Sequence, residues 1–215
     1  MQIAIESVIH LLHECSQAVI STHSTQMPGF PYGTAVPLVL DHEHHPVLLI
    51  SALAEHTKNL HADNRASLAV IEPNKSNVQD AARVTLVGQA EAFVPSPDLV
   101  QRYLRYQPEA EQSLQLDFTF FRFNVERARF IGGVGKMGWL EGKEWEISEQ
   151  ISPSEEIELL RQAKSLTPKN IRILGFDAFG IDYDAHGFKD RHRFDVPQTI
   201  DQLKAQLSDL LPTLT

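Results

Sequence analysis

Cysteine and long apolar runs are scarce in this sequence of 215 residues, which contains a single cysteine, Cys15. One cysteine excludes an internal disulfide, a thiolate zinc site and an iron–sulfur cluster. No run approaches the roughly 20 apolar residues that a membrane span requires, so we expect a protein that does not enter a membrane. Lys and Arg are absent from residues 1–15. A secretory signal has a basic front, so we expect a cytoplasmic protein.

Basic residues are outnumbered: 19 Lys and Arg stand against 28 Asp and Glu, giving a formal net charge of -9. Nucleic-acid binding depends on the neutralisation of phosphates, so this balance argues against a nucleic-acid partner. Hydrophobic residues make up 42% of the chain, enough for a buried core. We therefore expect a globular protein whose partners are small molecules or other proteins.

The first 150 residues carry the periodicity of short strands with a few helices between them. An amphipathic helix opens the chain, a short helix follows at residues 53–64, and Ser96-Pro97 marks the start of another. The expected strands lie near residues 18–22, 33–40, 47–51, 67–71 and 83–93. Residues 118–131 are rich in phenylalanine and are expected to form a β-hairpin. This arrangement predicts an antiparallel barrel with short flanking helices, an α+β fold.

The pattern changes after the acidic stretch at residues 144–152. Helices are expected near 154–164 and 199–211, with short strands between them. Residues 1–150 are therefore predicted to form the barrel, and 151–215 a small C-terminal α+β domain.

Several motifs in the first part occur in an order known from one superfamily. They are Pro31–Pro37, Ser51–Leu60 with His-Thr-Lys-Asn-Leu at its end, Ala82–Gly88, Asp117-Phe118 and Phe130–Gly133. In this order they resemble the pyridoxamine 5'-phosphate oxidase-like FMN-binding split barrels. Within that superfamily the sequence is most similar to the haem-utilisation branch, whose barrel is followed by an extra C-terminal domain.

The resemblance implies a homodimer with a flat cofactor at the subunit interface. It implies FMN as the cofactor, with haem as the alternative. The strand that contains Thr34 and Val36 would contact the flavin, and the remaining candidates would hold the phosphate end: Ser51, Thr57, Lys58, Arg83 and Thr85.

The residue types suit an anion independently of the resemblance. Lys58 offers a compact positive charge and Thr57 a hydroxyl near the start of a helix, where backbone N–H groups favour an anion. Arg83 offers a planar guanidinium that can hold a phosphate with two hydrogen bonds. Without the resemblance, Lys58 and Arg83 would equally be ordinary surface charges, and Thr85 an ordinary barrel residue.

A haem site would need a histidine ligand, and the chain has ten. His56 lies beside Lys58, while His186 and His192 lie in the C-terminal part. The Asn/Asp-His motif that opens this part in the haem-utilisation proteins is absent from residues 155–169. The group His42, His44 and His45 reads as a polar turn, and no metal site is assigned.

Other chemistry has little support. Cys15 is expected in the core, and Ser51 lacks the hydrolase elbow. The glycine spacing Gly133-x-Gly135-x-x-Gly138 is not followed by the long helix of a dinucleotide site. Three hypotheses stay open: an FMN-dependent oxidoreductase, a haem-binding or haem-degrading protein, and a non-catalytic dimer that has lost its ligand. Whether the protein is an enzyme is left open.

Overall fold

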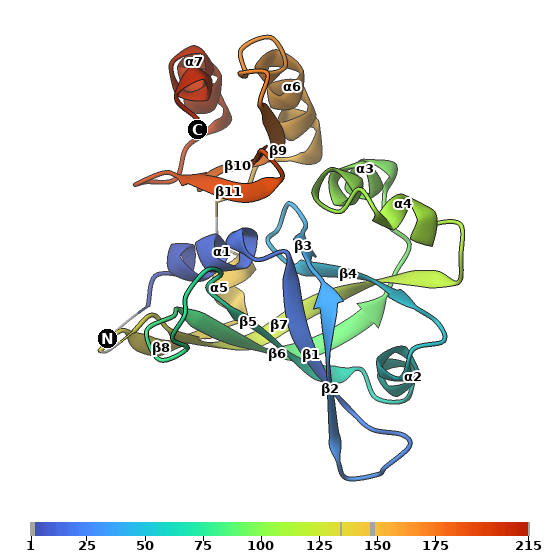
Figure 1. Cartoon of the computed structure of the whole chain (residues 1–215). Helices are drawn as coiled ribbons and strands as arrows, with labels where there is room; N and C mark the ends of the chain where they lie inside the picture. Colours follow the sequence, from blue (N-terminus) through green and yellow to red (C-terminus); the bar gives the residue numbers. More distant parts are fainter. Residues whose placement is uncertain (1–2, 134, 147–148, 215) are drawn as a thin grey trace. The chain divides into compact units, whose positions relative to one another are not determined.

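The computed structural model describes residues 3–133, 135–146 and 149–214. Val134 of the glycine motif lies outside them. The chain divides into two compact units, Met1–Ser148 and Glu149–Thr215. The first contains a curled antiparallel sheet with short helices, and the second a small sheet with two longer helices (Figure 1). The α+β class and the split barrel predicted from the sequence are confirmed.

The sheet of the first unit has eight strands in the order β2-β1-β5-β6-β7-β4-β3, with β8 paired to β7. All its neighbouring strands are antiparallel. The strands are β1 (Gln17–His23), β2 (Pro31–Pro37), β3 (Val39–Leu40), β4 (Pro46–Ser51), β5 (Arg65–Ile71), β6 (Arg83–Ala92), β7 (Phe118–Ile131) and β8 (Met137–Glu141).

Short helices lie before, between and after these strands along the chain. They are α1 (Ile5–Glu14), α2 (Glu55–Ala62), α3 (Pro97–Tyr106), α4 (Ala110–Ser113) and α5 (Lys143–Glu146). Helix α3 begins as the sequence predicts, because the Ser96 side chain accepts a hydrogen bond from the Leu99 N–H and Pro97 occupies the first turn.

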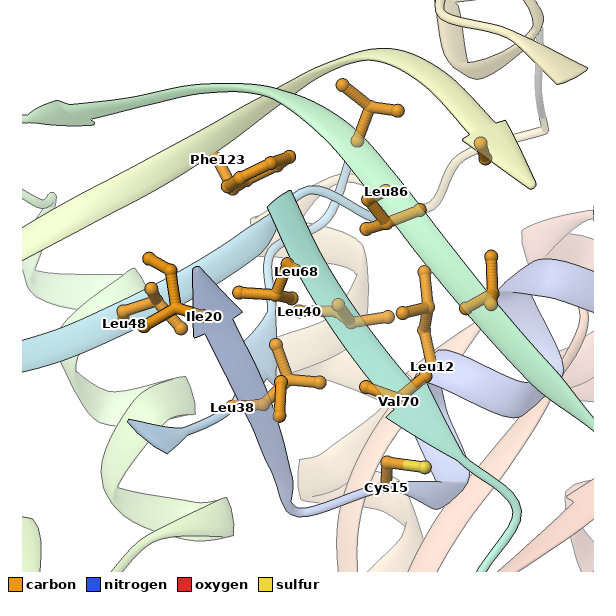
Figure 2. Packing of buried hydrophobic residues seen from close by; sticks show 14 of the residues in the cluster. Leu12, Cys15, Ile20, Leu38, Leu40, Leu48, Leu68, Val70, Leu86 and Phe123 are labelled. Atoms are coloured by element: carbon orange, nitrogen blue, oxygen red, sulfur yellow. The ribbon is translucent and has the colours of Figure 1, made fainter. Parts of the chain in front are cut away.

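Alternating apolar residues on the strands build the core of this unit. Figure 2 shows Ile20, Leu68, Leu86 and Phe123 meeting inside the curled sheet. Cys15 belongs to the same buried cluster, which agrees with its expected structural role. Because side chains on a strand alternate between faces, the other residues of β1, β5 and β6 face outward.

The hairpin predicted at residues 118–131 is wrong, since this segment forms the single 14-residue strand β7. The segment has no Gly, Pro or Asp that would turn the chain. Its first part pairs with β4 and its last part with β8, while β6 pairs along most of its length. The long strand is therefore stabilised by three neighbours instead of by its own hairpin partner.

The barrel does not close, because β2 and β4 are not paired with each other. β2 is the edge strand at one end of the sheet, and β3 covers only the first residues of β4, Pro46 and Val47. Residues 49–51 of β4 therefore lack a strand on that side, although β2 lies close by. The gap between these two strands is called the split below.

The second unit is a three-stranded sheet between two helices in sequence. Its elements are α6 (Pro153–Ala163), β9 (Ile171–Asp177), β10 (Gly180–Ala185), β11 (Phe188–Arg193), α7 (Ile200–Leu210) and a 3₁₀ turn at Leu211–Thr213. Ser152 forms a capping box at the start of α6. The buried Arg191 binds the carboxylates of Asp177 and Asp182 at 2.9 and 2.6 Å.

Candidate functional site

The split between β2 and β4 contains a cavity of about 500 Å³. Its walls come from β2, the end of β4, the start of α2, and α3 with the chain that follows it. The lining residues are Ala35, Val36, Pro37, Leu49, Ile50, Ser51, Ala54, His56, Tyr103, Gln107, Glu109, Ala110, Gln112, Ser113 and Phe118. This lining is mainly apolar and contains neither Lys nor Arg, so its walls suit the face of a flat ring.

Backbone groups of β4 that are not bonded to another strand face the cavity side. The N–H of Leu49 donates to the Tyr103 hydroxyl at 3.2 Å, so it points away from β7. Successive residues of a strand point their backbone groups to opposite sides, so Ser51 points the same way as Leu49. The Ser51 carbonyl indeed accepts from the Ala54 N–H and the Thr57 hydroxyl. The Ser51 N–H thus faces the split.

The backbone N–H and carbonyl groups of β2 also alternate in direction between its two sides. The N–H just after this strand, at Leu38, donates to the Ser16 carbonyl on the β1 side. Ala35 lies three residues earlier and therefore points its N–H and carbonyl away from β1, toward the split. Two strand edges thus present backbone donors and acceptors to the same cavity.

The first turn of α2 forms one end of the cavity. Its N-cap residue, Ala54, has no side chain that can accept from the first N–H groups of the helix. The Thr57 hydroxyl is buried and donates to the Ser51 carbonyl at 2.6 Å. Because first-turn N–H groups lack partners within a helix, this end favours an anionic group of a ligand.

His56 is the titratable group of the cavity wall closest to this helix start. Its Nε2 atom is buried and has no hydrogen-bond partner among the described residues. Burial lowers the pKa of His56, which favours the neutral imidazole. A neutral imidazole with an unengaged nitrogen can bind a metal.

The structure brings some of the predicted site residues together. Val36 and Ser51 line the cavity, and Thr57 contacts Ser51. Thr34 is half-buried on β2, two residues before Val36. Lys58 is exposed on α2 and is not part of the lining.

Arg83 and Thr85 lie elsewhere in the same unit. Arg83 is in register with Ile131 at one end of β7, whereas Ser51 is in register with Phe118 at the other end. A strand of this length extends over up to about 40 Å. The Arg83 guanidinium donates to the Val78 carbonyl at 2.9 Å. Within one chain, Arg83 and Lys58 are therefore not placed at one anion.

Sequence reasoning missed Tyr103, Leu49 and Phe118 as lining residues. Tyr103 lies on the apolar side of the predicted helix after Ser96, so its burial was foreseeable. Its position beside the split depends on the packing of α3 against β4, which no local pattern encodes.

The turn histidines are not arranged as a site on their own. His44 has a left-handed backbone, φ 61°, and its ring lies against His13 from α1, with Nε2 of His13 and Nδ1 of His44 3.2 Å apart. The His44 carbonyl accepts from the Trp145 indole at 3.2 Å. This buried pair links α1 to the turn, and no pattern in the sequence connects the two histidines.

The C-terminal histidines lie in the second unit. His186 is an exposed residue of the turn between β10 and β11, and His192 lies on β11 beside Phe194. Cys15 is buried, and its thiol donates to the Ile71 carbonyl at 3.4 Å.

The sequence profile of the CREG β-barrel family matches residues 7–146. The chain belongs to this family. The matched residues include the curled sheet and the split that holds the cavity. The family belongs to the split-barrel superfamily of pyridoxamine 5'-phosphate oxidase.

A curated relative is the non-canonical haem oxygenase HOZ, chloroplastic, of Arabidopsis thaliana, 30% identical over 132 residues. The aligned part covers 60% of this chain but only 40% of that protein. A haem-binding protein of Mycobacterium smegmatis is 25% identical, with a TM-score of 0.64 over 99% of this chain and 97% of that one. A protein of unknown function from Agrobacterium tumefaciens is 23% identical, with a TM-score of 0.76 over 96% and 94% of the chains.

None of the helices in the described ranges is long and apolar enough to cross a membrane.

Proposed function

We propose that this split-barrel protein binds haem in the cavity between β2 and β4, with His56 as the iron ligand. The observation that carries the proposal is the His56 imidazole, whose Nε2 lacks a partner at the wall of a mainly apolar cavity. Two relatives support it, because one is named as a haem oxygenase and another as a haem-binding protein.

The residues present fit the group. His56 would hold the iron through a neutral imidazole nitrogen, and its lowered pKa favours that form. No hydrogen bond holds Nε2, so turning the ring toward a ligand breaks none. Val36, Leu49 and Phe118 give apolar surface for the porphyrin faces. The uncapped start of α2 and the exposed Lys58 suit the propionates.

Bound haem would supply oxygen and electron-transfer chemistry, whose course depends on the polarity and access of the surrounding pocket. This chain contributes the imidazole, the apolar walls and the backbone groups of the two strand edges. The 500 Å³ cavity is within the usual size range of ligand sites.

Titration of the purified chain with haemin tests the proposal. We expect a Soret band that shifts or weakens in His56→Ala. His61→Ala is the matched control, because His61 lies on the same helix, is exposed and does not line the cavity. Equal spectra for all three proteins would remove His56 as the ligand, and the absence of any haem band would remove the haem proposal.

FMN is the second candidate, favoured by the unpaired strand edges. Ala35 and Ser51 offer backbone N–H groups, and the edge of an isoalloxazine ring carries carbonyl and imide groups that match such partners. The phosphate would take the start of α2, with Lys58 nearby. The absence of Lys and Arg from the cavity lining is the point against it.

Quenching of FMN fluorescence on addition of protein tests this candidate. Lys58→Gln should weaken FMN binding, and the control Lys75→Gln, which removes an exposed lysine paired with Glu72, should not. A flavin that binds both variants alike would exclude Lys58 as an anion ligand. If neither haemin nor FMN raises the melting temperature, a dimer that has lost its ligand is favoured.

The outward face of the sheet supports the proposal of a homodimer. Register places Ala35, Val19, Ala69, Thr85, Arg129 and Trp139 in one row across six strands. Val19 and Trp139 are 47% and 46% exposed, and the guanidinium of Arg129 lies over the Trp139 ring. An exposed tryptophan beside an arginine suits a protein–protein interface, where both residue types are enriched.

In such a dimer, Thr85 and Arg83 of one copy would contact a cofactor that Ser51 of the other copy holds. Sedimentation of the unmodified protein should show a dimer, and Val19→Glu, which places a charge at an exposed apolar position of the row, should shift it toward monomer. A monomer at all concentrations would contradict the dimer.

A further inference from the structure

Tyr103 on α3 occupies an unusual place at the cavity wall. The residue is 1% exposed, and its ring packs edge-on against Phe120, with centroids 5.3 Å apart. Its hydroxyl reaches the backbone of β4 at Leu49, the strand edge that forms the split. Both Tyr103 and Leu49 line the cavity.

The recorded hydrogen bond of the Tyr103 hydroxyl is one that it accepts. It accepts the Leu49 N–H at 3.2 Å, and a phenol also carries one O–H proton to donate. No acceptor for that proton is found within the described part of the chain. The Leu49 N–H satisfies the hydroxyl as an acceptor, and the phenol proton can still be donated to a group that enters the cavity.

The proton stays on the oxygen under ordinary conditions. Burial raises the pKa of Tyr103 to about 12, although the Leu49 N–H acts in the opposite direction. Tyr103 is therefore a fixed neutral donor. The Leu49 N–H also restricts where the oxygen lies, because the phenol must remain within reach of a backbone group.

We infer that Tyr103 positions the bound cofactor by donating a hydrogen bond to an oxygen or nitrogen acceptor of that cofactor. The inference rests on the proposed cofactor site in the split. The partner is an acceptor on a flat ligand, either a carboxylate, as in haemin, or a ring carbonyl, as in FMN. A ligand of the same size without an acceptor at this place would gain nothing from Tyr103.

Binding of haemin and of FMN to Tyr103→Phe tests the inference. This change removes only the hydroxyl and keeps the packing against Phe120. A neutral hydrogen bond contributes about 0.5–1.5 kcal/mol, so we expect roughly two- to twelvefold weaker binding of the ligand that accepts from Tyr103. Tyr106→Phe is the control, because Tyr106 lies on the same helix but does not line the cavity.

A spectroscopic readout separates positioning from a purely structural role. The tyrosine Fermi doublet in Raman spectra reports whether a phenol accepts or donates. Ligand binding should change the doublet of the unmodified protein and of Tyr106→Phe, and the change should vanish in Tyr103→Phe. A structural role alone would weaken binding without any ligand-dependent change of the doublet.

The outcomes are distinct from those of the proposed function. If the unmodified protein binds neither haemin nor FMN, the cofactor site and this inference both fall. If it binds and Tyr103→Phe binds equally well, or the doublet does not respond, this inference alone is overturned.

Discussion

Gly88 gives the sharpest test of the sheet, because it lies where β6 and β7 shift register between Val87 and Gly88. A Cβ atom at this position would collide with the backbone carbonyl oxygen of Asn124 and come within 3.1 Å of the Phe123 ring. The ring can turn slightly, but the carbonyl belongs to the neighbouring strand. Gly88→Ala therefore forces the two central strands apart.

The expected cost follows from overpacking, which destabilises by about 1–3 kcal/mol, with a small gain from the stiffer unfolded chain offsetting part of it. We expect a net loss of about 2 kcal/mol in the free energy of unfolding. With a urea m-value of about 2 kcal/mol/M, the midpoint should fall by about 1 M. Circular dichroism at one fixed protein concentration, without cofactor, measures this shift.

Gly33→Ala is the matched control. Its Cβ would meet the Ser21 hydroxyl at 3.6 Å, an ordinary contact, and Gly33 does not have a positive φ. This variant should be unchanged or up to about 1 kcal/mol more stable. Equal midpoints for Gly88→Ala and the unmodified protein would refute the close approach of β6 and β7.

Other predictions concern the second unit. Arg191→Met leaves two aspartates buried without their guanidinium and should cost about 3–5 kcal/mol in urea unfolding; a variant of unchanged stability would show that the cluster is dispensable. Hydrogen bonds from Arg161, and secondly from Gln162, lower the pKa of Glu158 to about 2. The ionised Glu158 therefore stabilises the folded state at pH values above the pKa of an unfolded glutamate, and this stabilisation is lost as the pH falls toward 2. Arg161→Ala should raise that pKa in an NMR titration, and an unchanged value would contradict the contact. Ser152→Ala removes the cap of α6 and should cost about 1 kcal/mol in the same urea assay, whereas no loss would exclude the capping box.

Local signals predicted most elements of the fold. Alternation of apolar residues located β1, β5 and β6, and Ser96-Pro97 located the start of α3. The failure at residues 118–131 has a physical cause, because alternation over a long segment shows that it is extended but not whether it turns. Only its pairing with β4, β6 and β8 shows that it is one strand.

The candidate site was predictable only in part. The motifs led to Ser51, Thr57 and Val36, which the structure places at or beside the cavity. They also led to Arg83, which lies at the other end of β7 because strand register, not distance in sequence, decides which residues meet.

The sequence by itself determined an acidic chain with one thiol, strands of alternating polarity and capped helices, since these follow from composition and from periods of a few residues. Only the tertiary structure decided that β2 and β4 stay unpaired, that His56 and Tyr103 face the resulting cavity, and that Arg83 is far from Lys58. These features depend on contacts between residues tens of positions apart, and such contacts leave no local pattern in the chain.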